Sequence, residues 1–83
     1  MKCFSCNKCS FIKTAGIQEI EAGIDDGNNM AYLMFEDSQE LNAVLAKYYQ
    51  ADTVVNLNDF LRNYKTVRQL MKEVINNRRV IGG

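Results

Sequence analysis

The feature that most constrains the fold is a run of apolar side chains spaced alternately three and four residues apart near the end of the chain. The run consists of Leu57, Phe60, Tyr64, Val67, Met71 and Val74. This spacing places the side chains on one side of an α-helix and is typical of a heptad seam. Asn56 offers an N-cap, and Asp59 falls in the first turn, where negative charge is favourable. We therefore expect a long final helix that ends at about Asn77.

A short strand followed by a short helix is expected at the other end of the chain. Residues 2–4 read as a strand, and Ser5 is the type of residue that caps the start of a helix. The helix is expected over residues 6–15, because Gly16 then supplies the usual left-handed stop. Its apolar side carries Cys9, Ile12 and Ala15.

The middle of the chain predicts a β-hairpin. Residues 17–24 and 30–36 show the two-residue period of strands, and residues 25–29 between them are rich in Asp, Gly and Asn. The second strand carries Ala31, Leu33 and Phe35 on one face and Met30, Tyr32 and Met34 on the other. Because both faces are apolar, we expect both to be covered.

A second helix is expected after the hairpin. Asp37 or Ser38 caps it, Glu40 is placed to complete a capping box, and its apolar stripe consists of Leu41, Val44, Leu45 and Tyr48. The predicted order is therefore β-α-β-β-α-α. This is an α+β fold in which a short antiparallel sheet is packed by two or three helices, with the long helix last. Residues 1–83 are expected to form a single domain, with residues 78–83 as a flexible tail.

Several motifs resemble one known family. They are Tyr32-Leu33-Met34-Phe35-Glu36-Asp37-Ser38, Glu40-Leu41, the aromatic pair Tyr48-Tyr49, and Phe60-Leu61-x-Asn63-x-Lys65-x-Val67-Arg68. Over residues 15–73 the chain resembles a small domain family of unknown function from bacteria, archaea and their viruses, with a strand that runs into Phe-Glu-Asp-Ser-x-Glu-Leu. The resemblance implies this architecture and a viral or mobile-element setting, but no activity.

Three cysteines form a C-x2-C-x2-C pattern that admits two interpretations. Cys3, Cys6 and Cys9 have the spacing of metal ligands, so a zinc or redox protein is one alternative. A structural zinc ion takes four ligands, however, and the chain has no histidine and no fourth cysteine. The favoured interpretation is that Cys6 and Cys9, one helical turn apart, act as small buried apolar residues. We expect no cofactor.

The sequence does not predict catalysis. There is no histidine for proton transfer near neutral pH and no Gly-rich phosphate-binding loop. Glu19 and Glu21 fall on a polar strand face, and Asp25 and Asp26 lie in a turn that lacks the closing glutamate of a calcium loop. We expect a protein that is not an enzyme.

Positive charge is concentrated near the end of the chain. Residues 1–49 contain four Lys or Arg and seven Asp or Glu, whereas residues 50–83 contain six and three. On the long helix, Arg62, Lys65, Arg68, Lys72 and Arg79 fall along one flank of the apolar seam. This basic stripe indicates either contact with phosphates, as in a nucleic-acid-binding accessory protein, or a solvated face whose aliphatic stems cover the edge of the core.

The leading prediction is a protein-interaction module that forms a homodimer. Its predicted interaction surface consists of Tyr32, Met34, Tyr64, Val67, Met71 and Val74, because one small core is not expected to cover all of the apolar area. Nucleic acid is the second candidate partner. No apolar run approaches the length of a membrane span, and polar residues follow Met1, so a cytoplasmic location without membrane contact is expected.

Overall fold

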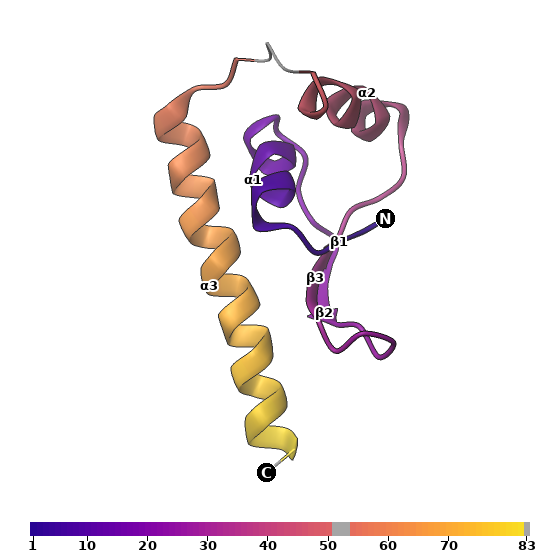
Figure 1. Ribbon diagram of the computed structural model, residues 1–83, viewed down its shortest axis with the longest axis vertical. Helices are drawn as coiled ribbons and strands as arrows, with labels where there is room; N and C mark the ends of the chain where they lie inside the picture. Colours follow the sequence, from indigo (N-terminus) through magenta and orange to yellow (C-terminus); the bar gives the residue numbers. More distant parts are fainter. Residues whose placement is uncertain (51–53, 83) are drawn as a thin grey trace.

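The computed structural model describes residues 1–50 and 54–82, and the side chains of residues 78–82 lie outside this description. The elements are β1 (Lys2–Cys3), α1 (Cys6–Thr14), β2 (Glu21–Ile24), β3 (Ala31–Met34), α2 (Gln39–Tyr48) and α3 (Leu57–Gly82). The predicted order and the α+β class are confirmed. Helix α3 runs along most of the length of the molecule, and α1 lies between it and α2 (Figure 1).

The three strands form one antiparallel sheet in the order β1-β3-β2. Its register aligns Cys3, Leu33 and Ala22 in a row across the sheet, on the face that meets the core. The hairpin strands are shorter than predicted, since pairing covers 21–24 and 31–34 rather than 17–24 and 30–36. Of the missing residues of the first strand, Ile17 belongs to the turn that ends α1, whereas the amide of Ile20 already donates to Met34 O of β3 at 2.8 Å.

Helix α1 begins and ends as the sequence predicts. The amide of Lys8 donates to Ser5 Oγ at 3.2 Å, so Ser5 is the N-cap. Gly16 has a φ of +98°. Its amide donates to Lys13 O at 3.0 Å, and the amide of Ile17 donates to Ile12 O at 3.3 Å. This pair of hydrogen bonds is a Schellman motif, which explains why Ile17 packs against the core instead of extending the strand.

Helix α2 begins at the second of the two predicted caps. The amide of Leu41 donates to Ser38 Oγ at 3.0 Å, which places Glu40 at the second helical position, one short of a capping box. The predicted apolar stripe faces inward: Leu41 is buried, while Val44, Leu45 and Tyr48 are half-buried. Tyr48 meets Phe11 of α1 edge to face, with ring centroids 5.4 Å apart, so α2 is attached chiefly to α1.

Helix α3 begins at its predicted cap but ends later than predicted. The amide of Asp59 donates to Asn56 Oδ1 at 3.0 Å. The expected end at about Asn77 is wrong, because the helix continues to Gly82. No glycine or proline occurs between Leu57 and Gly82 to interrupt it. A flexible tail was predicted for residues 78–83. The side chains of residues 78–82 and the whole of residue 83 lie outside the described part, so this stays a prediction.

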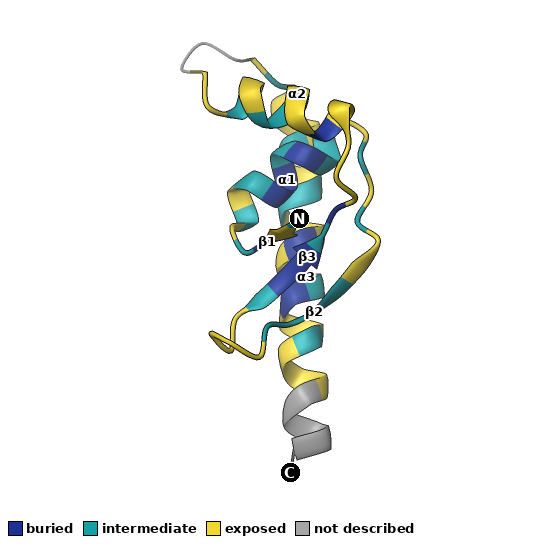
Figure 2. Ribbon diagram, turned by 90° about the vertical axis from the view of Figure 1, so that its right-hand side faces the viewer, coloured by how far each residue is buried: buried dark blue, intermediate teal, exposed yellow. Residues whose placement is uncertain are grey.

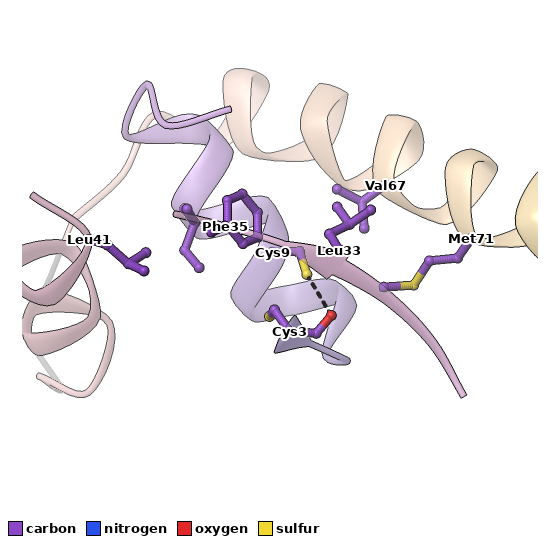
Figure 3. Close-up of a cluster of buried hydrophobic side chains, with 8 residues drawn as sticks. Cys3, Cys9, Leu33, Phe35, Leu41, Val67 and Met71 are labelled. Atoms are coloured by element: carbon purple, nitrogen blue, oxygen red, sulfur yellow. Dashed lines mark hydrogen bonds between the residues drawn. The ribbon is translucent and has the colours of Figure 1, made fainter. Parts of the chain in front are cut away.

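The core lies where α1, α3 and one face of the sheet meet (Figures 2 and 3). Its buried members are Cys3, Cys9, Ile12, Leu33, Phe35, Leu41, Val67 and Met71. The contact between α1 and α3 is the most extensive between any two described elements. The long helix is therefore held by the seam that the sequence analysis identified, through Val67 and Met71.

The opposite face of the sheet is covered only in part, and without a helix: Met30 is 50% exposed and Met34 is half-buried, so the expectation that this whole face is covered is wrong. Tyr32 is only 8% exposed although its side chain points away from Leu33. Phe4 packs edge to face against its ring at 6.1 Å, and Lys2 Nζ lies 4.8 Å from the ring centroid. Gly23 lies directly under the ring, since a Cβ there would stand 2.9 Å from Tyr32 Oη. The expectation that both faces of this strand are covered thus holds for Tyr32 through neighbouring strand residues.

The Schellman motif makes a testable prediction. Gly16→Ala forces a side chain into a left-handed backbone with φ +98°, although no atom lies within 4 Å of the new Cβ. We expect the free energy of unfolding to fall by about 1–2 kcal/mol from backbone strain alone. Gly16→Asn is the matched control and should cost less, because Asn adopts this conformation more readily. Equal urea midpoints for the wild type and Gly16→Ala would contradict this account.

Candidate interaction surface on helix α3

The structure places half of the predicted interaction surface inside the domain. Val67 is fully buried, and Tyr32 and Met71 are each 8% exposed. Met34, Tyr64 and Val74 are half-buried. The seam therefore serves to hold α3 against α1 and the sheet, and these three buried side chains have little surface to offer another molecule. Any contact surface on α3 must use other residues.

A second apolar row on α3 is exposed. Leu57, Leu61 and Ile75 are 66%, 47% and 39% exposed. At 100° per residue, they fall on the same flank of the helix as Tyr64 and Arg68. We call these five residues the outer flank. Leu61, Arg68 and Ile75 are spaced seven residues apart, so the outer flank has heptad spacing of its own, beside the buried seam.

The sequence analysis missed Leu61 and Ile75 as surface residues. Both lie one position after a member of the buried seam, so they looked like the edge of one broad apolar arc. The sequence nevertheless contained a signal, namely the adjacent apolar pairs Phe60-Leu61 and Val74-Ile75. Such pairs make the apolar arc of the helix wider than one small core can cover. Only the packing of α1 decides which row is buried.

The basic stripe lies on the solvent side of the outer flank. Arg62, Lys65, Arg68 and Lys72 are exposed, and the side chain of Arg79 lies outside the described part. Arg62 Nη1 is 3.5 Å from Asp59 Oδ1, and Arg68 lies 6.0 Å from the centre of the Tyr64 ring. Within the described residues, no carboxylate is within 4 Å of Lys65, Arg68 or Lys72. Lys65, Arg68 and Lys72 line a shallow hollow of about 250 Å³.

The cysteines are part of the packing between β1, α1 and α3. Cys3 and Cys9 are buried, and Cys6 is half-buried. Cys9 Sγ donates to Cys3 O at 3.5 Å (Figure 3), whereas Cys6 Sγ donates to Met71 Sδ at 3.4 Å. Among the described residues, no three Cys, His, Asp or Glu side chains are arranged to hold a metal ion. Cys9 is buried as predicted, whereas Cys6, for which burial was also predicted, is only half-buried.

Two of these thiols have opposite acidities. A hydrogen bond from the Cys9 thiol, together with the Ser5 backbone and the charge of Lys8, lowers the pKa of Cys3 to about 7 despite burial. The same hydrogen bond and burial raise the pKa of Cys9, which keeps its proton. Burial alone would have raised both, so the contact between the two thiols decides the outcome for Cys3.

The acidic hairpin turn has a structural explanation. Asp25 Oδ2 accepts hydrogen bonds from the amides of Gly27 and Asn28 at 3.0 and 3.2 Å, and Asp25 Oδ1 pairs with Lys2 Nζ at 2.7 Å. The Lys2 hydrogen bond is the largest cause of the lowered pKa of Asp25. Asn29 then adopts a φ of 59° to close the turn. Both carboxylate oxygens of Asp25 are therefore engaged within the turn and by Lys2.

The chain matches a known family over most of its length. The family model described as "Domain of unknown function (DUF5659)" matches residues 1–74. The chain belongs to this family. The DUF5659 match includes both hairpin strands and the part of α3 that carries the buried seam, and it ends one residue before Ile75. No curated protein and no solved structure matches the chain.

None of the described helices has the length and apolarity needed to cross a membrane. Helix α3 is long enough, at 26 residues, but charged side chains lie along it from Asp59 to Lys72.

The division of α3 into a buried seam and an outer flank predicts a difference between two truncations. Val67→Ala removes a fully buried side chain and should lower the free energy of unfolding by about 1–3 kcal/mol. Leu61→Ala, on the same helix but 47% exposed, should change it by less than about 0.5 kcal/mol in the monomer. Chemical denaturation at low protein concentration measures both. A larger loss for Leu61→Ala would show that the flank is misassigned.

Proposed function

We propose that this DUF5659 domain is a small non-enzymatic protein-interaction module that self-associates through the outer flank of α3. The observation that supports it most directly is the exposure of Leu57, Leu61 and Ile75 along one flank of a 26-residue helix. Large apolar side chains that are exposed along one flank of a helix are typical of contact surfaces, and here Arg68 separates Leu61 from Ile75. The viral or mobile-element setting that the sequence resemblance implies is part of this proposal and rests on that resemblance alone.

The spacing of the outer flank favours a second α3 as the partner. Two helices pack as a coiled coil when each presents apolar residues with heptad spacing, and 26 residues correspond to about 39 Å of helix. The buried seam already holds α3 to its own domain, so pairing along the outer flank needs no unfolding. The proposed partner is a second copy of this chain, because a second copy presents the same outer flank.

The charges on the outer flank favour an antiparallel arrangement. A parallel pair would place Arg68 against Arg68 of the second copy at the centre of the seam, where like charges repel. An antiparallel pair instead places Arg68 beside Tyr64 of the second copy, where a guanidinium lies favourably over an aromatic ring. The same alignment brings Leu57 next to Ile75 of the second copy. Lys65 of the two copies would then approach each other at the rim.

The absence of catalysis is also part of the proposal. Two carboxylates that could serve as a general acid or base are instead paired with lysines. Glu19 lies 2.7 Å from Lys13 Nζ, and Asp25 lies 2.7 Å from Lys2 Nζ. Both carboxylates are half-buried, and each holds its own segment of the chain against a lysine of another element. The domain would act by presenting a surface.

A second candidate function is nucleic-acid binding through the basic stripe. It is favoured by the exposed cations of Lys65, Arg68 and Lys72, which have no carboxylate within 4 Å in the described part of the chain. Each phosphate that such a cation neutralises adds a salt-dependent increment to affinity. The net charge of zero for the whole chain weighs against it.

A charge placed in the outer flank tests self-association. We expect Leu61→Glu combined with Ile75→Glu to weaken dimerisation at least about tenfold, because pairing would bury two new charges. Thr66→Glu combined with Asn77→Glu is the matched control, with the same charge change on the side of α3 about 140–160° away. Sedimentation velocity across micromolar concentrations measures all three proteins. A monomeric wild type, or equal effects of both pairs, would overturn the proposal.

Salt dependence separates the two candidate functions. Added salt should leave dimerisation unchanged or strengthen it, because it screens the approach of the two Lys65 side chains. Retention on DNA or RNA should instead fall as salt rises, and charge reversal of Arg62, Lys65 and Lys72 should abolish it. Salt-sensitive retention by a protein that stays monomeric would favour the nucleic-acid function.

A further inference from the structure

We propose that the antiparallel pair of α3 helices presents one basic face that binds the phosphate backbone of duplex nucleic acid. This inference rests on the proposed self-association and deepens it, because the face is complete only in the dimer. Its main residues are Lys65 and Lys72, which are exposed and, in the described part of the chain, have no carboxylate within 4 Å. Both line the same shallow hollow of about 250 Å³ on α3.

On each α3, these lysines and the rest of the domain lie on opposite sides of the outer flank. At 100° per residue, Lys65 and Lys72 lie about 50–70° from the middle of the outer flank in one direction, and Val67 and Met71 lie about 50–90° in the other. Val67 and Met71 face the core, and the other helices and the sheet all lie to one side of α3 (Figure 1). Contact through the outer flank therefore leaves the lysines uncovered.

The antiparallel arrangement places the lysines of both copies on the same face. The two-fold axis of an antiparallel pair is perpendicular to the plane that contains both helices, so each copy contributes the same side to the same face. In a parallel pair the axis runs along the helices, and the two sets of lysines would point to opposite faces. The antiparallel dimer thus has Lys65 and Lys72 of both copies on one face and both domain bodies on the other.

The spacing of these four lysines suits a phosphate backbone. When Leu57 lies next to Ile75 of the second copy, the two Lys65 side chains lie near the middle, and the two Lys72 residues are about 18 Å apart along the seam at 1.5 Å per residue. This distance corresponds to about five base pairs at 3.4 Å each. Phosphates would also neutralise the repulsion between the two Lys65 side chains, so duplex binding and dimerisation strengthen each other.

Other described charges near this face are engaged elsewhere. Arg62 Nη1 lies 3.5 Å from Asp59 Oδ1, and Arg68 is directed to an aromatic ring. The Glu73 carboxylate accepts a hydrogen bond from a glutamine amide of the same helix at 3.3 Å. We therefore count only two lysines of each copy as phosphate contacts.

The net charge of zero does not oppose such a face. The exposed carboxylates of Glu36, Asp37 and Glu40 lie between β3 and the first turn of α2, within the domain body and not on α3. The dimer therefore separates negative from positive charge, and a concentrated patch of one sign attracts a partner of the other sign.

The aromatic residues of α3 favour a duplex over a single strand as the ligand. Proteins that bind single strands stack the bases on aromatic rings. Phe60 and Tyr64 are the aromatic residues of α3, and both fall on the domain side of the middle of the outer flank. The basic face therefore offers charge without stacking, which suits contact with a backbone regardless of its sequence.

The salt dependence of duplex binding tests the four-lysine face. The probe is a short fluorescent DNA duplex of mixed sequence, and its anisotropy is measured at several salt concentrations with the protein above its dimer dissociation constant. Each neutralised phosphate contributes about −0.9 to the slope of log affinity against log salt. Lys65→Gln combined with Lys72→Gln should therefore make the slope less negative by about 3.6 and weaken binding at least about tenfold at low salt. A change of only about 1.8 would mean that single copies bind, and would overturn the inference.

Two further variant pairs separate this inference from self-association. Lys8→Gln combined with Lys47→Gln removes the same charge from α1 and α2 and should leave the slope unchanged. Leu61→Gln combined with Ile75→Gln changes no charge and should weaken dimerisation and duplex binding together. A dimer that does not bind the duplex, an equal change of slope in the Lys8 and Lys47 control, or duplex binding that survives loss of the dimer would overturn this inference while self-association stands. A monomeric wild type would overturn both.

Discussion

The packing of α3 across α1 and the sheet is the contact on which the rest of the structure depends. Val67 and Met71 lie in the same buried cluster as Ile12 of α1 and Leu33 of β3. No other pair of described elements makes as extensive a contact as α1 and α3. A sheet of three strands, the longest with four paired residues, has too little area to form a core by itself. The long helix supplies the missing apolar surface.

Local signals predicted most of the secondary structure because each was satisfied locally. The caps at Ser5, Ser38 and Asn56, and the left-handed Gly16, depend on hydrogen bonds that span at most five residues, and all four occur. The end of α3 was mispredicted because no glycine or proline occurs between Asn77 and Gly82, so the periodicity that ends near Asn77 could not indicate where the helix stops. The predicted strand lengths were wrong because the length of a strand depends on how many of its residues pair with the neighbouring strand.

The candidate surface was harder to predict because it depends on a choice between two faces. The sequence placed apolar residues on an arc of α3 wide enough for two contacts, but periodicity does not say which edge α1 covers. The contacts of Cys6 with Met71 and of Asn63 with Thr14 orient the helix, and both join residues about 50 or more positions apart. The burial of Tyr32 could not be predicted from periodicity either, because Lys2 and Phe4, nearly 30 positions away in the sequence, cover its ring without any helix.

If the domain self-associates as proposed, the division of α3 into two rows allows stability and association to change independently. Residues of the buried seam contribute to folding whether or not a second copy is present, whereas the outer flank gains apolar burial only on contact. A domain this small has little stability to spare, so a partner-facing row separate from the core lets the surface vary without loss of the fold. Leu61 beside Phe60, and Ile75 beside Val74, place the two roles one residue apart on the same helix. The single-residue offset between the rows is what would allow α3 to serve as a structural element and also as the contact surface that we propose.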